Sequence, residues 1–282
     1  MSAKLQFVFS LSAVLLVPAL GAQQPASQAA AKEPIADNSF LMEEAYNQEP
    51  GVVQHISAFS KVTGQRAWAY SFTQEWPAPG QRHQLSYTLP LMNTGAGGTT
   101  GVGDLMINYR YQAIYDEEKG VAFSPRLSVS LPTGDKNKGL GVGATGWQVN
   151  LPVSKTLGGS FVSHSNAGAT WFSSAPSVGK DASMKSVNLG QSLIWLVAPR
   201  FNVMLEAVWS RTTSTISGHD SSVENAFISP GIRWGYDFRS GLQVVPGVAF
   251  PIGVGQSNGT KQVLVYLSFE HPFTQAAKAT AK

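Results

Sequence analysis

Three short patterns in the sequence could carry chemistry, and the first places a histidine beside a serine in His164-Ser165-Asn166. A serine nucleophile needs a histidine base within hydrogen-bond reach. Neighbouring side chains of an extended strand point to opposite faces, so His164 and Ser165 cannot pair directly. His164 and Asn166 share a face instead, which favours a hydrogen-bonded pair over catalysis.

The second and third patterns resemble ligand-binding loops. The glycines of residues 141–146 match the G-x-G-x-x-G spacing of a dinucleotide loop, but a lysine-containing loop precedes them and no helix follows. Asp135 and Asn137 could contact a calcium ion, yet they supply too few oxygens and two lysines lie beside them. We therefore predict a glycine-rich external loop and a turn at these two places.

Cysteine is absent from the chain. This excludes a disulfide framework, a thiolate metal site, a cysteine nucleophile and a bacterial lipoprotein anchor. The sequence also lacks a phosphate loop, a zinc-binding helix motif and a G-x-S-x-G motif. We therefore expect a protein that is not an enzyme and that holds no catalytic residue, metal or cofactor.

Polar residues at alternate positions of predicted strands are the remaining candidates for function. Charges in a low-dielectric wall need a partner or water, so each either links neighbouring strands or sets the solute preference of a pore. We favour the linking role for any single residue. Arg110 and Arg126 carry like charge on adjacent predicted strands, so one of them could line a path for anions. The candidate pore-lining residues are Asp104, Asn108, Arg110, Arg126, Gln148, Asn150, His164, Asn166, Glu206, Arg233 and Glu270.

Two-residue alternation of large apolar and small polar residues runs through the chain after Gly51 and predicts the elements that position these side chains. It yields about twelve strands, most of them long enough to cross a bilayer. The connections alternate in length, as they do in outer-membrane barrels, and an even strand number places both termini on the short-turn side. The first connection, near Thr63-Gly64, is also short. The other short connections are 76–81, 116–120, 155–157, 199–200 and 237–241, and the longer ones are 90–102, 132–144, 173–184, 211–223 and 253–261.

Composition agrees with this assignment. Only 13% of the residues are charged, 43% are hydrophobic, and 28 glycines accompany 10% aromatic residues. A net charge of +3 is too small to indicate nucleic-acid binding. We predict an all-β protein, a single antiparallel up-and-down transmembrane β-barrel of about twelve strands. The alternative fold is a soluble secreted sandwich.

The first 22 residues are typical of a secretory signal peptide, with Lys4 before an apolar stretch and small residues before Gln23. Residues 23–37 form a flexible leader, and residues 38–51 form an N-terminal segment that could enter the lumen as a plug. The barrel spans 52–273 and a tail spans 274–282. The segment from Phe40 to Tyr46 could form one or two helical turns. Its candidate plug residues are Phe40, Glu43, Glu44 and Tyr46.

Five stretches resemble the outer-membrane transporter proteins of the meta-pathway phenol-degradation family of proteobacteria. The stretches are short, and the resemblance spans most of the mature chain; they are residues 38–55, 101–105, 108–112, 126–135 and 146–154. The resemblance implies an outer-membrane barrel in a Gram-negative bacterium, and some members are linked to uptake of aromatic compounds. It carries over no set of functional residues. The nine residues after Phe273 depart from the usual barrel terminus.

These observations predict a passive channel in the outer membrane for small solutes, including aromatic or other organic compounds. The expected partners are outer-membrane lipid, the barrel-assembly machinery and a small-molecule solute, without nucleic acid; the sequence leaves the oligomeric state open. Two alternatives remain. One is a structural or surface-interaction barrel without transport. The other is a lipid hydrolase, which needs a serine and a histidine on one face near the outer rim, and no such pair is found.

Overall fold

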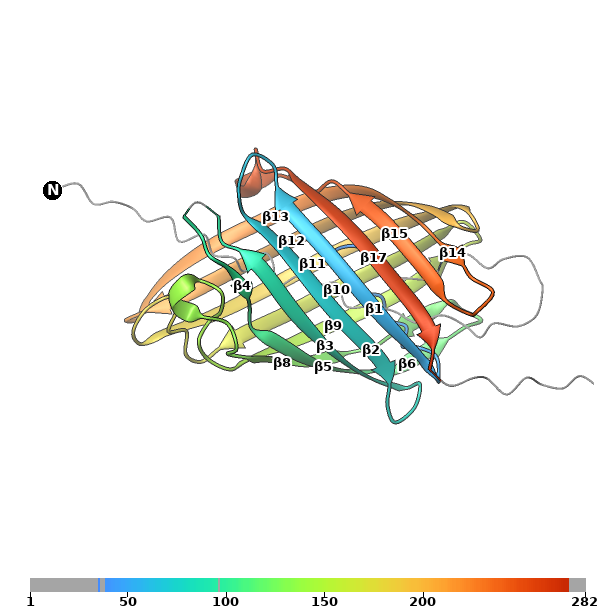
Figure 1. The fold of residues 1–282 in the computed structure, drawn as a ribbon, viewed down its shortest axis with the longest axis horizontal. Helices are drawn as coiled ribbons and strands as arrows, with labels where there is room; N and C mark the ends of the chain where they lie inside the picture. Colours follow the sequence, from blue (N-terminus) through green and yellow to red (C-terminus); the bar gives the residue numbers. More distant parts are fainter. Residues whose placement is uncertain (1–34, 36–38, 96, 274–282) are drawn as a thin grey trace, which may run out of the picture.

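The chain folds into a closed antiparallel β-barrel of twelve strands (Figure 1). This computed structural model describes residues 35, 39–95 and 97–273; the predicted signal peptide, most of the leader and the tail lie outside them. No helix among these residues is long and apolar enough to cross a membrane. The strand segments are β1 (Val52–Val62), β2 (Trp68–Pro77), β3 (His83–Asn93), β4 (Thr100–Val102), β5 (Leu105–Tyr111), β6 (Ile114–Asp116), β7 (Val121–Phe123), β8 (Arg126–Leu131), β9 (Gly146–Leu157), β10 (Phe161–Phe172), β11 (Ala182–Ala198), β12 (Phe201–Ile216), β13 (His219–Trp234), β14 (Tyr236–Asp237), β15 (Gln243–Ala249), β16 (Ile252–Gly253) and β17 (Gln262–Pro272).

Four of the twelve strands are interrupted, which explains the seventeen segments. β4–β6, β7–β8, β13–β14 and β15–β16 each form one strand. Pro125 and Pro251 lie in two of the breaks, where a residue without an N–H cannot donate to the ladder.

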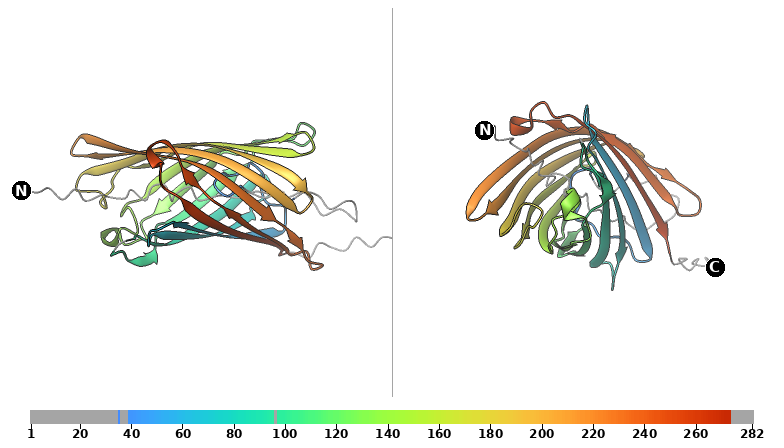
Figure 2. Two further views of the ribbon diagram at one scale, coloured as in Figure 1. Left: turned by 90° about the horizontal axis from the view of Figure 1, so that it is seen from above. Right: turned by 60° about the vertical axis from the view of Figure 1, so that its left-hand side comes forward.

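Pairing of the first strand with the last closes the sheet. β1 pairs with β17 over its whole length, from Val52 opposite Pro272 to Val62 opposite Gln262. The strands tilt across the barrel axis, and the oblique view in the right panel of Figure 2 shows the curved wall (Figures 1 and 2). Closure leaves no unpaired edge through the membrane-depth part of the wall.

Alternation gives the wall two different faces. Inward positions such as Ser86, Ser128 and Ser192 are small, polar and buried, whereas the outward positions between them carry exposed aliphatic and aromatic side chains. Aromatic pairs lie near both ends of the wall: Trp147 faces Trp171 at one end, and Phe161 faces Trp195 at the other. Such belts sit at the two interfaces of a bilayer.

The end of the barrel that holds Gly51 and Phe273 is called here the turn end. Its connections are 78–82, 117–120, 158–160, 199–200 and 238–242. The opposite, loop end carries 63–67, 94–99, 132–145, 173–181, 217–218 and 254–261. One predicted connection is wrong. Residues 211–223 are not a long loop, because β12 and β13 continue to Ile216 and from His219, joined by Ser217 and Gly218 alone.

Backbone and side-chain contacts explain this long hairpin. Ser217 and Gly218 have φ values of 50° and 82°, the left-handed pair of a two-residue hairpin turn. Thr213 bonds Ser222 and Thr215 bonds Asp220 across the strands. Threonine favours strands, which is why a Ser/Thr-rich segment that looks like a loop is extended here.

Gly218→Val should loosen this hairpin. A β-branched residue at φ 82° costs about 1–3 kcal/mol in backbone strain, so amides of residues 213–222 should exchange faster with solvent while barrel amides keep their protection. Hydrogen exchange with mass spectrometry measures this. Gly159→Val, in a turn whose glycine has open space around it, is the control; equal exchange in the two variants would contradict the assignment.

Candidate functional site

Residues 39–50, called here the plug segment, lie inside the turn-end half of the barrel. Their backbone N–H groups donate to wall side chains: Leu41 to Glu206 Oε1 at 2.8 Å, Glu43 to Asn166 Oδ1 at 2.9 Å and Ala45 to Ser154 Oγ at 2.7 Å. The segment contains no helix, so the predicted helical turns are wrong. Its amides bond the wall rather than the carbonyls four residues earlier.

Three wall glycines, Gly190, Gly231 and Gly247, leave the space that apolar side chains of the plug segment occupy, and these positions are called here the glycine seats. A Cβ on Gly247 would lie 2.5 Å from two ring atoms of Phe40, and one on Gly231 would lie 2.6 Å from the same ring. A Cβ on Gly190 would overlap the Met42 sulfur. Phe40 and Met42 are fully buried, and Phe40 packs edge-on against Tyr266. Side chains at these three wall positions would displace the segment.

The acidic and basic residues meet between the plug segment and the wall. Arg126 Nη2 lies 2.6 Å from Glu43 Oε1, and both side chains are buried. Arg110 is directly opposite Arg126 and donates to Asn47 Oδ1 at 2.9 Å and to the Glu44 carbonyl at 3.2 Å. The two arginines are therefore engaged with the plug segment, and an anion path along one of them stays a prediction.

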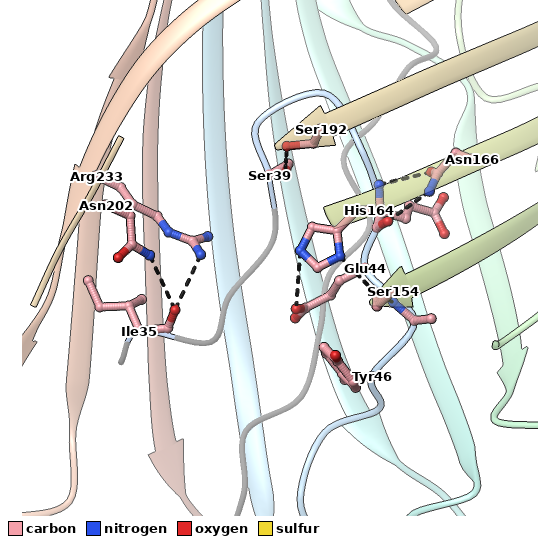
Figure 3. Close-up of polar contacts among 12 residues, drawn as sticks. Ile35, Ser39, Glu44, Tyr46, Ser154, His164, Asn166, Ser192, Asn202 and Arg233 are labelled. Carbon is pink, nitrogen blue, oxygen red and sulfur yellow. Dashed lines mark hydrogen bonds and ion pairs between the residues drawn. The ribbon is translucent and has the colours of Figure 1, made fainter. Parts of the chain in front are cut away.

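Ser154, His164 and Glu44 form a constellation that the sequence analysis missed (Figure 3). Ser154 Oγ lies 2.8 Å from His164 Nδ1, and Glu44 Oε2 lies 4.0 Å from His164 Nε2. The two strand residues face each other symmetrically across the 158–160 turn, a register that hairpin pairing could have predicted. Ser154 already accepts the Ala45 amide, and both wall residues are buried beneath the segment. Tyr46 packs edge-on against His164.

The ends of the plug segment are tied to the turn end of the wall. The Gln48 side chain donates from Nε2 to Glu270 Oε1 at 3.1 Å, and the Gln48 backbone N–H donates to Gln84 Oε1 at 2.7 Å. Gln84 in turn bonds Glu75, a buried acid of β2. The sequence analysis missed Glu75, although its place between Gln74 and Trp76 in an alternating strand indicates the inner face.

Ile35 and Ser39 make the earlier contacts (Figure 3). The Ile35 carbonyl accepts from Asn202 Nδ2 at 3.3 Å and from Arg233 Nη2 at 3.4 Å, and Ser39 Oγ bonds Ser192 Oγ. The chain therefore passes the β12–β13 wall, turns at Phe40–Glu43 and returns along β9 and β5 to Gly51. This path crosses the interior of the barrel.

Asp104 has a different role from the other predicted lumen residues. Its carboxylate accepts the amides of Gly134 at 2.9 Å and Val142 at 2.7 Å, which holds the 132–145 loop against the loop end. Leu140 of that loop is buried against Ala69 and Met92. The glycine-rich stretch lies in this loop up to Gly146, the first residue of β9.

The same loop contains the predicted turn at Asp135. The residue caps a short 3-10 helix (Lys136–Lys138) and pairs with Lys138 at 2.9 Å. The hydrogen bond from Lys138 lowers the pKa of the Asp135 carboxyl. Among the described residues, no group of three or more His, Asp or Glu side chains could hold a metal ion.

All eleven candidate lumen residues are buried on the inner face. Six of them contact the plug segment: Arg110, Arg126, His164, Asn166, Glu206 and Glu270. Arg233 contacts Ile35, and Asn108, Gln148 and Asn150 bond neighbouring wall residues. The assembled site is a polar lumen wall to which the chain's own plug segment is bonded.

Comparisons with known proteins agree with this fold. An outer membrane channel from Pseudomonas putida F1 superposes with a TM-score of 0.63 at 14% identity, over 79% of this chain and 95% of that chain. The NanC porin superposes with a TM-score of 0.50 at 10% identity, over 77% of this chain and 98% of that chain. At these identities the likeness concerns the fold, that of outer-membrane β-barrels. A search of curated proteins found no match.

The sequence family described as "Putative MetA-pathway of phenol degradation" matches residues 51–269. That range comprises nearly the whole barrel and well over half of the chain. The chain therefore belongs to this family of phenol-degradation-associated proteins.

Proposed function

We propose that the protein is an outer-membrane channel for passive passage of small solutes, and that the plug segment closes it. The observation that carries the proposal is the bonding of that segment: its amides donate to side chains of β3, β9, β10 and β12, and its apolar residues fill glycine seats. Export through residues 1–22 and insertion by the barrel-assembly machinery complete the proposal.

Small aromatic compounds are the solutes that we propose first. The support is the description of the family, which refers to phenol degradation. The channel named among the similar structures supports transport in general. Phenol flux into proteoliposomes, compared with empty liposomes, tests this finer part on its own.

Removal of residues 23–50 should raise ion conductance. The truncated chain keeps β1 from Val52, and its lumen loses the buried filling that spans the turn end. We expect rare or no steps from the intact protein and stable steps from the truncated one in planar bilayers. Heat-modifiable migration on gels checks that both have folded. Silence from a folded truncated barrel would contradict the proposal.

A closed structural barrel is the second candidate, and one observation favours it. The buried Glu43–Arg126 pair and the plug segment fill the turn-end half of the lumen. The truncation experiment separates the two candidates, because a structural barrel remains silent or loses its fold when the filling is removed.

A further inference from the structure

Two arginines of the wall hold oxygen atoms of the plug segment. Arg126 of β8 binds the Glu43 carboxylate, with 2.6 Å between Nη2 and Oε1. Arg110 of β5 is directly opposite Arg126. Arg110 donates to Asn47 Oδ1 at 2.9 Å and to the Glu44 carbonyl at 3.2 Å. The plug segment therefore covers a pair of guanidinium groups with acceptor atoms of its own.

The ion pair between Glu43 and Arg126 uses only part of its bonding capacity. Arg126 Nε and Glu43 Oε2 are both buried, and neither atom has a hydrogen-bond partner within the described part of the chain. A carboxylate that is free to align on a guanidinium makes two parallel hydrogen bonds, which are stronger than one. Glu43 is not free to align, because its N–H and its carbonyl are both bonded to the Asn166 side chain. A carboxylate that is not part of the chain has no such restraint.

A further donor lies beside this arginine. Ser128 is the next inward residue of β8, since side chains two residues apart in a strand share a face. Its side chain is buried, and its Oγ atom has no hydrogen-bond partner among the described residues. The hydroxyl can donate to an acceptor that binds next to Arg126.

Charge selects the class of ligand that can replace Glu43. When the plug segment leaves, Arg126 loses its counter-charge, and a buried charge without a partner is strongly unfavourable. Glu75 of β2 is a wall acid whose charge acts on Arg110, but it already accepts a hydrogen bond from Gln84. A carboxylate solute restores the missing negative charge. An uncharged solute leaves it missing, and a cation meets two guanidinium groups.

We propose that Arg126, with Arg110 beside it, is the binding site for a small organic carboxylate, and that Glu43 occupies this site in the closed barrel as a built-in competitor. This proposal rests on the proposed channel function and adds the substrate class. The carboxylate of the solute takes the volume that the Glu43 carboxylate leaves, so the site needs no separate cavity. Solute and plug segment exclude each other at Arg126, so binding of the solute shifts the protein toward its open state.

The test compares benzoate with benzamide, an uncharged molecule of the same size, on the intact protein in planar bilayers. We expect benzoate to raise the open probability as its concentration rises, and benzamide to leave the open probability unchanged. Arg126→Lys keeps the charge but loses the planar fork, so half-maximal opening should need at least about tenfold more benzoate, the loss of one charge-assisted hydrogen bond. Arg211→Lys, in a half-exposed pair with Glu224, is the matched control and should respond to benzoate as the intact protein does.

The outcomes separate the two proposals, because conductance of the barrel without residues 23–50 reports on the channel alone. If that barrel conducts and benzoate does not open the intact protein, or opens it no better than benzamide, the carboxylate site is overturned and the channel stands. An equal benzoate response in the intact protein and Arg126→Lys also overturns the site. Silence of the folded truncated barrel overturns both proposals. Opening by benzoate that Arg126→Lys weakens and Arg211→Lys does not supports both.

Discussion

Gly247→Leu should turn a closed barrel into a conducting one. The Cβ alone would lie 2.5 Å from the Phe40 ring, and the rest of a leucine would occupy the space of that ring. The Phe40 ring is rigid and fully buried, so a small rotation of this ring cannot make room for the leucine. Overpacking costs about 1–3 kcal/mol, a factor of about 5–150 in favour of the displaced segment. Single-channel open probability measures the change.

A second substitution tests whether the effect is steric. Phe40→Ala in the same chain removes the ring that collides with the leucine, so closure should return in the double variant. The wall tolerates the leucine with a small shift, since the Ile232 carbonyl lies 3.1 Å from the added Cβ. Gly159→Leu, whose Cβ meets nothing within 4 Å, is the matched control. Equal conductance of the single and double variants would show that Phe40 does not hold the segment in place.

Much of the barrel could be predicted because strand alternation is a local property of the sequence. Each inward position is set by the residue two places away, so Asn108 and Arg110 or His164 and Asn166 follow directly from the pattern. The closed antiparallel barrel of twelve strands was predicted and is confirmed. The same alternation places Glu75 in the lumen, because it lies two residues after the buried Thr73 of β2.

The interior of the site depended on contacts that no local pattern contains. Asp104 was predicted as a pore-lining residue, but its partners are amides of a loop about thirty residues later in the chain. The segment from Phe40 to Tyr46 has a local helical pattern, which is overridden because wall side chains accept its amides. Glycines 190, 231 and 247 carry no signal in the sequence that sets them apart, and only the folded structure shows that Phe40 and Met42 pack over them.

Glu43→Gln should release the plug segment through charge rather than shape. The substitution keeps the size of the side chain and leaves the Arg126 guanidinium buried without its counter-charge. Breaking one partner of a buried ion pair costs about 3–5 kcal/mol, a shift of about 150- to 4000-fold toward the displaced segment. The two backbone bonds between Glu43 and Asn166 survive the change, so any opening reports on the charge.

Replacement of both partners distinguishes this mechanism from general destabilisation. In the Glu43→Met, Arg126→Met variant neither member of the pair remains without the other, and apolar side chains of similar volume often match or exceed a buried pair in stability. Closure should therefore return, although two polar contacts have been lost. Lys138→Gln, which breaks the exposed pair with Asp135, should leave open probability unchanged. If the double methionine variant opens as readily as Glu43→Gln, the segment is held by the specific hydrogen bonds of Arg126 to Glu43 and Gln148 and not by charge balance.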